Sequence, residues 1–128
     1  MSNLPLKKQI FIFLVIGSTT VLIDYIFYIS IIYLFNLVVI GKIISYILGT
    51  VFSFFANSKW TFQYKGSDKN NFLKFILLYF ISLLINSLVN SFMLNFLNVN
   101  SAFVIATITS ATLNFIGMKF FIFKEGDL

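Results

Sequence analysis

The segment "IISYILGTVFSFFANSKWTF", residues 43–62, joins a long apolar run to a polar end that contains a lysine and a tryptophan. The whole chain has the same apolar character, because 59% of its 128 residues are hydrophobic and only 10% are charged. A soluble domain does not have this composition. A bilayer admits only helices and closed barrels, and the short alternating segments of barrel strands are absent. The sequence therefore predicts an all-α integral membrane protein.

Polar clusters divide the chain into apolar segments, and a helix needs about 20 apolar residues to span a bilayer. The clusters are "FNLVV" (35–39), "NSKWTFQYKGSDKNN" (57–71) and "LNVNS" (97–101). They predict four transmembrane helices, at residues 9–34, 39–58, 71–95 and 100–121. The basic start of the first segment is also typical of a secretory signal. Its apolar stretch runs past Asp24 to Phe35, however, which favours a retained membrane anchor.

Lysines are distributed unevenly between the ends of these segments. Eight lie at one end and only Lys42 at the other; the eight are Lys7, Lys8, Lys59, Lys65, Lys69, Lys74, Lys119 and Lys124. Because loops rich in lysine stay on the cytoplasmic side, both termini and the middle loop are predicted to be cytoplasmic. Lys59 and Trp60 then lie at the membrane interface, where lysine meets phosphate head groups and an indole sits in the aromatic belt. Simple anchoring is the alternative role for both residues.

The two halves of the chain resemble each other. At an offset of 62, "TVLID" (20–24) aligns with "SLLIN" (82–86), and at an offset of 61, "SFFANSKWTF" (53–62) aligns with "NFIGMKFFIF" (114–123). One transmembrane domain over 1–128 is therefore predicted to contain two helical hairpins, at about 9–62 and 71–123, with a linker at 63–71. Each hairpin holds an even number of spans, so the two would be parallel repeats about an axis along the membrane normal.

The sequence resembles the GtrA-like family over nearly its whole length. The pattern F-L-V-x-G occurs at Phe13–Gly17, and Asp24 follows it by seven positions; N-x-[KR]-W-T-F occurs at 57–62, Lys74 and Phe75 open the third segment, and 114–123 is a degenerate copy of the second pattern. The resemblance implies a small four-span protein of the bacterial cytoplasmic membrane, active in cell-surface polysaccharide synthesis. It implies flipping of a polyprenyl-phosphate-linked sugar, which a membrane glycosyltransferase then uses to modify a polymer such as teichoic acid or O-antigen.

Polar residues at helical spacing form candidate binding stripes within the first and third segments. Asp24 is the only acid inside a predicted span, where an ionised aspartate costs about 2.5–3.5 kcal/mol and needs a polar surrounding. The candidate sugar path consists of Thr20, Asp24, Tyr28, Ser82, Asn86 and Asn90. The candidate phosphate and interface residues are Asn57, Lys59, Trp60, Lys74 and Lys119. A structural alternative is a simple hydrogen bond between Asp24 and Asn86. The small residues of the second segment, Gly41, Ser45, Gly49 and Ser53, are predicted to pack helices.

Other function classes remain open. A non-transporting scaffold could recruit a glycosyltransferase through the basic loop at 63–71 and bind anionic membrane lipid there. A small multidrug-type exporter also has four short spans, but its dual insertion needs balanced lysines. An enzyme is not expected, because the chain has no histidine or cysteine, and no cofactor, metal or nucleic acid is expected either. Four spans make a small wall for a substrate path, which a homodimer or a partner protein would enlarge.

Overall fold

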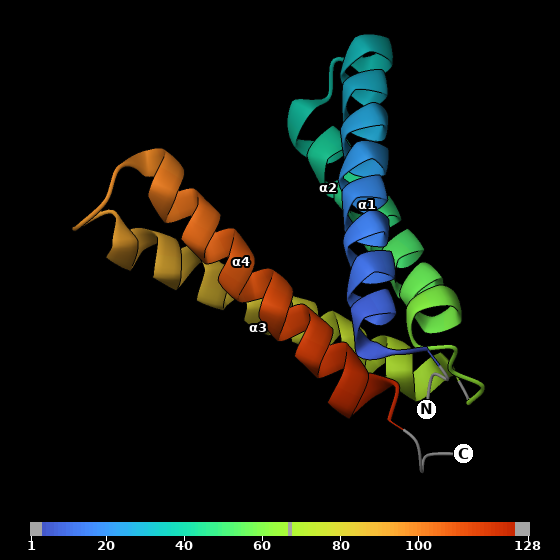
Figure 1. Cartoon of the computed structure of the whole chain (residues 1–128). Coiled ribbons are helices and arrows are strands. Elements are labelled where there is room, and N and C mark those ends of the chain that lie inside the picture. Colours follow the sequence, from blue (N-terminus) through green and yellow to red (C-terminus); the bar gives the residue numbers. More distant parts are fainter. Residues whose placement is uncertain (1–3, 67, 125–128) are drawn as a thin grey trace. The chain divides into compact units, whose positions relative to one another are not determined.

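The computed structural model describes residues 4–66 and 68–124, and no strand occurs in these ranges. Figure 1 shows the helices in chain order. They are α1 (Leu6–Phe35), α2 (Val38–Ala56), η1 (Asn57–Thr61), α3 (Asp68–Met93), α4 (Val99–Gly117) and η2 (Met118–Ile122). The predicted all-α class is therefore confirmed for the described part of the chain. The apolar segments form these helices because a helix satisfies every backbone hydrogen bond within itself.

The chain divides into two compact units, Met1–Tyr64 and Lys65–Leu128. In the first unit α1 packs against α2 and η1, and we call these elements the first helix pair. In the second unit α3 packs against α4 and η2, which form the second helix pair. Within each pair the two long helices follow one another through a short turn (Figure 1).

Three stretches of helix are long and apolar enough to cross a membrane: Leu6–Phe35, Lys69–Met93 and Val99–Ile122. Most large apolar side chains on them are exposed, as expected for helices surrounded by lipid. The remaining helix, α2, has 19 residues, which is about 28 Å at 1.5 Å per residue. That α2 also spans the membrane stays a prediction, as do the parallel-repeat arrangement of the hairpins and the sides on which the termini lie.

Two of the predicted breaks contain the residues that end or begin a helix. Asn36 ends α1 in the left-handed conformation, with φ 55°, and its N–H donates to the Ile32 carbonyl at 2.8 Å. Asparagine adopts this conformation more readily than other residues with a Cβ. Asn98 precedes α4, and its side-chain oxygen accepts a hydrogen bond of 2.8 Å from the Ser101 N–H. The side chain thus caps one of the N–H groups that the first helical turn leaves without a partner.

The linker between the two pairs is shorter than the predicted 63–71. Helix α3 begins at Asp68, so Asn71 lies within a helix and is buried. The polar run at Lys69 and Asn70 does not break the helix, because both residues are exposed at its first turns, where polar side chains are tolerated.

Both helix pairs end in a π-helix. The first, η1, covers Asn57–Thr61, and the second, η2, covers Met118–Ile122, so the two lie 61 residues apart. Each is closed by an i→i+5 bond: the Phe62 N–H donates to the Asn57 carbonyl at 2.9 Å, and the Phe123 N–H donates to the Met118 carbonyl at 2.8 Å. The π-helix is rare and occurs mostly as single turns, often at functional sites. The offset between them equals the one that aligns the two halves of the sequence.

Candidate functional site

Asp24 lies where α1 meets α2. The Ser45 hydroxyl on α2 donates a hydrogen bond of 2.6 Å to Oδ1 of Asp24 on α1. One turn further along α2, a Cβ at Gly49 would lie 3.3 Å from the Thr20 carbonyl oxygen and 3.6 Å from Cβ of Asp24. The predicted packing role of the small residues is confirmed here, because Gly49 lets α2 approach the backbone of α1 beside the acid.

The acid is deep within a long apolar helix. Asp24 lies eighteen residues after the first residue of α1 and eleven before the last. Its side chain is only partly exposed, as are those of Thr20 and Tyr28. The Thr20 hydroxyl donates to the Ile16 carbonyl at 2.8 Å, one turn earlier on α1. The first three residues of the predicted sugar path therefore share one side of α1, and Thr20 and Asp24 are beside α2.

The second helix pair has a polar contact at the corresponding place. Asn86 donates through Nδ2 to the Ser110 hydroxyl at 3.0 Å, and the Ser82 hydroxyl donates to the Ser110 carbonyl at 3.3 Å. Ser110 is the counterpart of Gly49 at the offset of 61, and Asn86 is the counterpart of Asp24 at 62. Asp24 lies beside Gly49 and Asn86 lies beside Ser110, so the two pairs bring equivalent positions together. The hydroxyl comes from Ser45 in the first pair and from Ser110 in the second.

The predicted sugar path draws its residues from both units. The structure brings Thr20 and Asp24 together within the first helix pair, and Ser82 and Asn86 within the second. Asn90 lies one turn after Asn86 on α3 and is partly exposed. A single path lined by both sets stays a prediction, and so does a hydrogen bond between Asp24 and Asn86.

Asn57 has a different environment from the interface position that the sequence predicted. It is 1% exposed, and its Nδ2 donates to the Ser53 carbonyl at 2.9 Å and to the Ser53 hydroxyl at 3.2 Å. Its Oδ1 accepts a hydrogen bond of 2.8 Å from the Thr61 hydroxyl. The side chain therefore links the end of α2 to the last residue of η1. In the second pair the corresponding residues, Met118 and Ile122, are buried and apolar.

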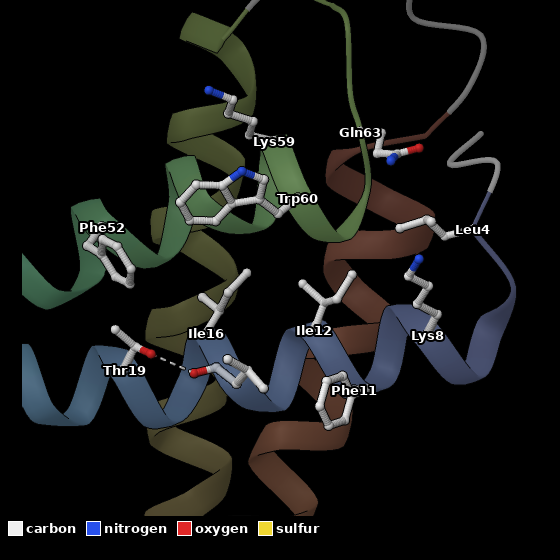
Figure 2. Close-up of a pocket in the computed structure, with 11 residues that line it drawn as sticks. Leu4, Lys8, Phe11, Ile12, Ile16, Thr19, Phe52, Lys59, Trp60 and Gln63 are labelled. Atoms are coloured by element: carbon white, nitrogen blue, oxygen red, sulfur yellow. Dashed lines mark hydrogen bonds between the residues drawn. The ribbon is translucent and has the colours of Figure 1, made fainter.

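A pocket of about 650 Å³ lies between the start of α1 and the end of the α2–η1 segment (Figure 2). Lys59 and Trp60, both predicted interface residues, line it from η1, and Gln63 follows them in the chain. The wall contributed by α1 runs from Lys8 to Thr19. The complete lining is Leu4, Lys8, Phe11, Ile12, Val15, Ile16, Thr19, Phe52, Lys59, Trp60 and Gln63.

Sequence reasoning did not identify Lys8 and Gln63 as site residues. Lys8 was interpreted only as an orientation signal, and Gln63 as part of a linker. The clue that could have found them is the packing of consecutive helices, which returns the end of η1 to the start of α1 and so places the two polar ends together.

The other two predicted phosphate residues, Lys74 and Lys119, belong to the second helix pair. Nζ of Lys119 lies 5.9 Å from the centre of the Phe115 ring and 5.8 Å from that of the Phe120 ring, within cation–π range. Lys74 is exposed on α3. Neither lines the pocket of the first pair.

The comparison with protein families identifies the chain. The family model described as GtrA/DPMS, transmembrane domain, matches residues 12–123, which include all of α2 and α4 and both π-helices. No solved structure matches the chain. The resemblance seen in the sequence is thus confirmed, and the family indicates a role in handling lipid-linked sugars in the membrane. The protein belongs to the GtrA/DPMS transmembrane domain family.

Proposed function

We propose that this protein moves a polyprenyl-phosphate-linked sugar across the bacterial cytoplasmic membrane, where the sugar is used to glycosylate a wall or surface polysaccharide. The family supports the substrate class. The observation that carries the proposal is the contact between Asp24 and Ser45, since it holds an acid at the meeting of two apolar helices. A carboxylate is expensive at such a place in a bilayer and marks a substrate pathway more often than a packing contact.

The chemistry of the substrate sets what the path must offer. The polyprenyl tail can stay in the bilayer, but the sugar-phosphate head needs successive hydrogen-bond partners. Thr20, Asp24 and Tyr28 offer such groups along the first pair, and Ser82, Asn86 and Asn90 along the second. A carboxylate would repel a phosphate, so in this proposal Asp24 accepts hydrogen bonds from sugar hydroxyls. The phosphate would meet lysine at the membrane surface.

The proposed topology has four spans, two parallel hairpins and both termini in the cytoplasm. The chain would act without catalysing a reaction. A membrane glycosyltransferase that consumes the sugar on the outer side would give the movement its direction. A homodimer would supply further walls for the path, because two helix pairs alone enclose little space.

The test is translocation in proteoliposomes that contain the purified protein and a short-chain polyprenyl-phosphate hexose. A membrane-impermeant reagent that reacts with the sugar reports how much lipid lies in the outer leaflet. We expect the wild-type protein to equilibrate the lipid faster than empty liposomes, and Asp24→Asn and Asn86→Leu to remove the acceleration. Thr112→Val is the matched control, because its hydroxyl is exposed on α4 and donates only to the Ile108 carbonyl at 2.8 Å.

A folded protein that gives no acceleration would refute transport by the chain alone. The alternative would then be a scaffold that recruits its glycosyltransferase, and replacing the basic loop at 63–71 would abolish glycosylation in cells. Acceleration that survives both Asp24→Asn and Asn86→Leu would keep the flipping activity and refute the path.

A further inference from the structure

The pocket of the first helix pair has polar donors at one end. Lys8, Lys59, Trp60 and Gln63 all line it and are exposed, and no acidic residue does. Neither lysine side chain makes an ion pair or hydrogen bond with another described residue. Two lysines, a tryptophan and a glutamine therefore border a cavity that has no acidic residue among its lining side chains. These donors favour an anion with several acceptor oxygens, such as a phosphate group.

The rest of the pocket is apolar. Figure 2 shows Ile12 and Ile16 on α1 below the Trp60 ring, and Phe52 on the α2 side. From Lys8 to Thr19 the wall of α1 extends over twelve residues, and the eleven rises between them cover about 16 Å of helix. The cavity volume of about 650 Å³ falls within the range of about 300–1,000 Å³ that is usual for ligand sites. A ligand that fits both ends has an anionic head and a hydrocarbon chain.

The second helix pair does not repeat these donors. At the offsets that align the two halves, Lys8 corresponds to Asn70, Lys59 to Phe120 and Trp60 to Phe121. The neighbouring Lys119 lies over two phenylalanine rings of its own pair instead. The cationic pocket is thus a property of the first pair, although the backbone of both pairs ends in the same way.

We propose that this pocket binds the phosphate of a prenyl phosphate lipid, with Lys8 and Lys59 on the phosphate and the first prenyl units against Ile12, Val15 and Ile16. The prenyl character of the chain rests on the proposed function, whereas the anionic head and the apolar chain rest on the pocket itself. The first helix pair then captures the lipid at the membrane surface, and the path beyond it handles the sugar.

Trp60 makes this site directly observable. It is the only tryptophan in the chain, it is 51% exposed, and it lines the pocket. The experiment titrates the full-length protein, in nanodiscs of phosphatidylcholine, with farnesyl phosphate while the Trp60 fluorescence is recorded. Farnesol, inorganic phosphate and phosphatidylglycerol are titrated in parallel. We expect saturable binding of farnesyl phosphate and binding at least about tenfold weaker for each of the other three compounds. Farnesol lacks the charged head, inorganic phosphate lacks the hydrocarbon chain, and phosphatidylglycerol lacks the single prenyl tail.

The key variant is Lys8→Gln with Lys59→Gln, in which two exposed charges at the pocket are removed. Its matched control is Lys65→Gln with Lys124→Gln, which removes the same charge from exposed lysines outside the pocket. We expect the pocket variant to bind farnesyl phosphate about tenfold more weakly and the control to bind like the wild type, because only the first removes charge-assisted hydrogen bonds. A third variant, Val15→Phe, fills the apolar end of the pocket and should also weaken binding. Phenylalanine is chosen rather than tryptophan because a second indole would obscure the Trp60 fluorescence.

Three results would overturn the inference. Farnesol that binds as tightly as farnesyl phosphate would remove the role of charge, and a control pair that weakens binding as much as the pocket variant would reduce the effect to surface attraction. Phosphatidylglycerol that binds as tightly as farnesyl phosphate would make the pocket a general lipid site. The readout is separate from translocation. If farnesyl phosphate binds as expected but proteoliposomes show no flipping, the pocket stands and the transport proposal fails. If flipping occurs and the Trp60 fluorescence reports no binding, the transport proposal stands and the pocket proposal fails.

Discussion

The Ser45 hydroxyl lies 2.6 Å from Oδ1 of Asp24, so the one acid in the middle of α1 is bonded to α2. The partner comes from the small-residue face of α2, which also places Gly49 against the Thr20 carbonyl. Packing and polar chemistry therefore use the same helix face. The close approach that small residues allow is what brings the hydroxyl within reach of the carboxyl group.

Ser45→Ala should lower stability slightly and impair transport more. Hydrogen bonds between membrane helices contribute about 0.6 kcal/mol on average and about 1.7 at most, so the fold should survive. The loss of the donor would let the Asp24 carboxyl change its orientation in the path. Ser30→Ala is the control, because the Ser30 hydroxyl is exposed and donates to the Ile26 carbonyl of its own helix at 2.7 Å. Unfolding in mild detergent and translocation are measured together, and a variant with wild-type transport would contradict a positioning role for Ser45.

Gly49→Leu should destabilise the first helix pair, and Gly17→Leu should not. A Cβ at Gly49 meets a backbone carbonyl at 3.3 Å, which cannot move without shifting α1, whereas a Cβ at Gly17 has nothing within 4 Å. Overpacking of this kind costs about 1–3 kcal/mol. The two variants add the same side chain to a helical glycine, so the difference between their free energies of unfolding isolates the contact. Equal effects would mean that Gly49 is not at a close helix crossing.

Asn57→Met and Thr61→Ile should each destabilise the protein. The double variant should lose less free energy of unfolding than the sum of the two single losses. Either change alone leaves a buried polar partner without its 2.8 Å bond, at about 1–3 kcal/mol. The double variant reproduces the apolar pair Met118 and Ile122 of the second helix pair, and so leaves neither group of that bond behind. A double-mutant cycle on the free energy of unfolding measures the coupling. Simple additivity would show that the two side chains do not act together.

The membrane topology can be checked by cysteine labelling, because the natural chain has no cysteine. Leu37→Cys and Phe96→Cys, which lie between the helices of each pair, should react with an impermeant thiol reagent in whole cells. Lys65→Cys should react only after the membrane is permeabilised. Eight of the nine lysines lie toward the end of the helices that contains Lys65, and such ends stay cytoplasmic. Reaction of both Leu37→Cys and Lys65→Cys in intact cells would show that α2 does not span, and reaction of Lys65→Cys alone would reverse the predicted orientation.

Much of the fold could be predicted from local sequence, because insertion in lipid depends on hydropathy and helix ends depend on a few residues. The apolar segments became helices, Asn36 and Asn98 lie at helix ends as the polar clusters predicted, and the small residues of α2 face α1. The sequence also singles out Asp24 as the one acid within a predicted span. Its bond to Ser45 was not foreseen, because spacing along one helix does not say which residue of the next helix lies opposite.

The class of the protein, its helices and its family follow from composition or from patterns within short segments. The burial of Asn57 within the π-turn, and the pocket that Lys8 shares with Lys59 and Trp60, depend on how the chain folds back on itself. Both arise from the geometry of the first helix pair. The i→i+5 turn of η1 sets which side chains point inward, and the return of α2 along α1 brings together residues that are distant in the chain.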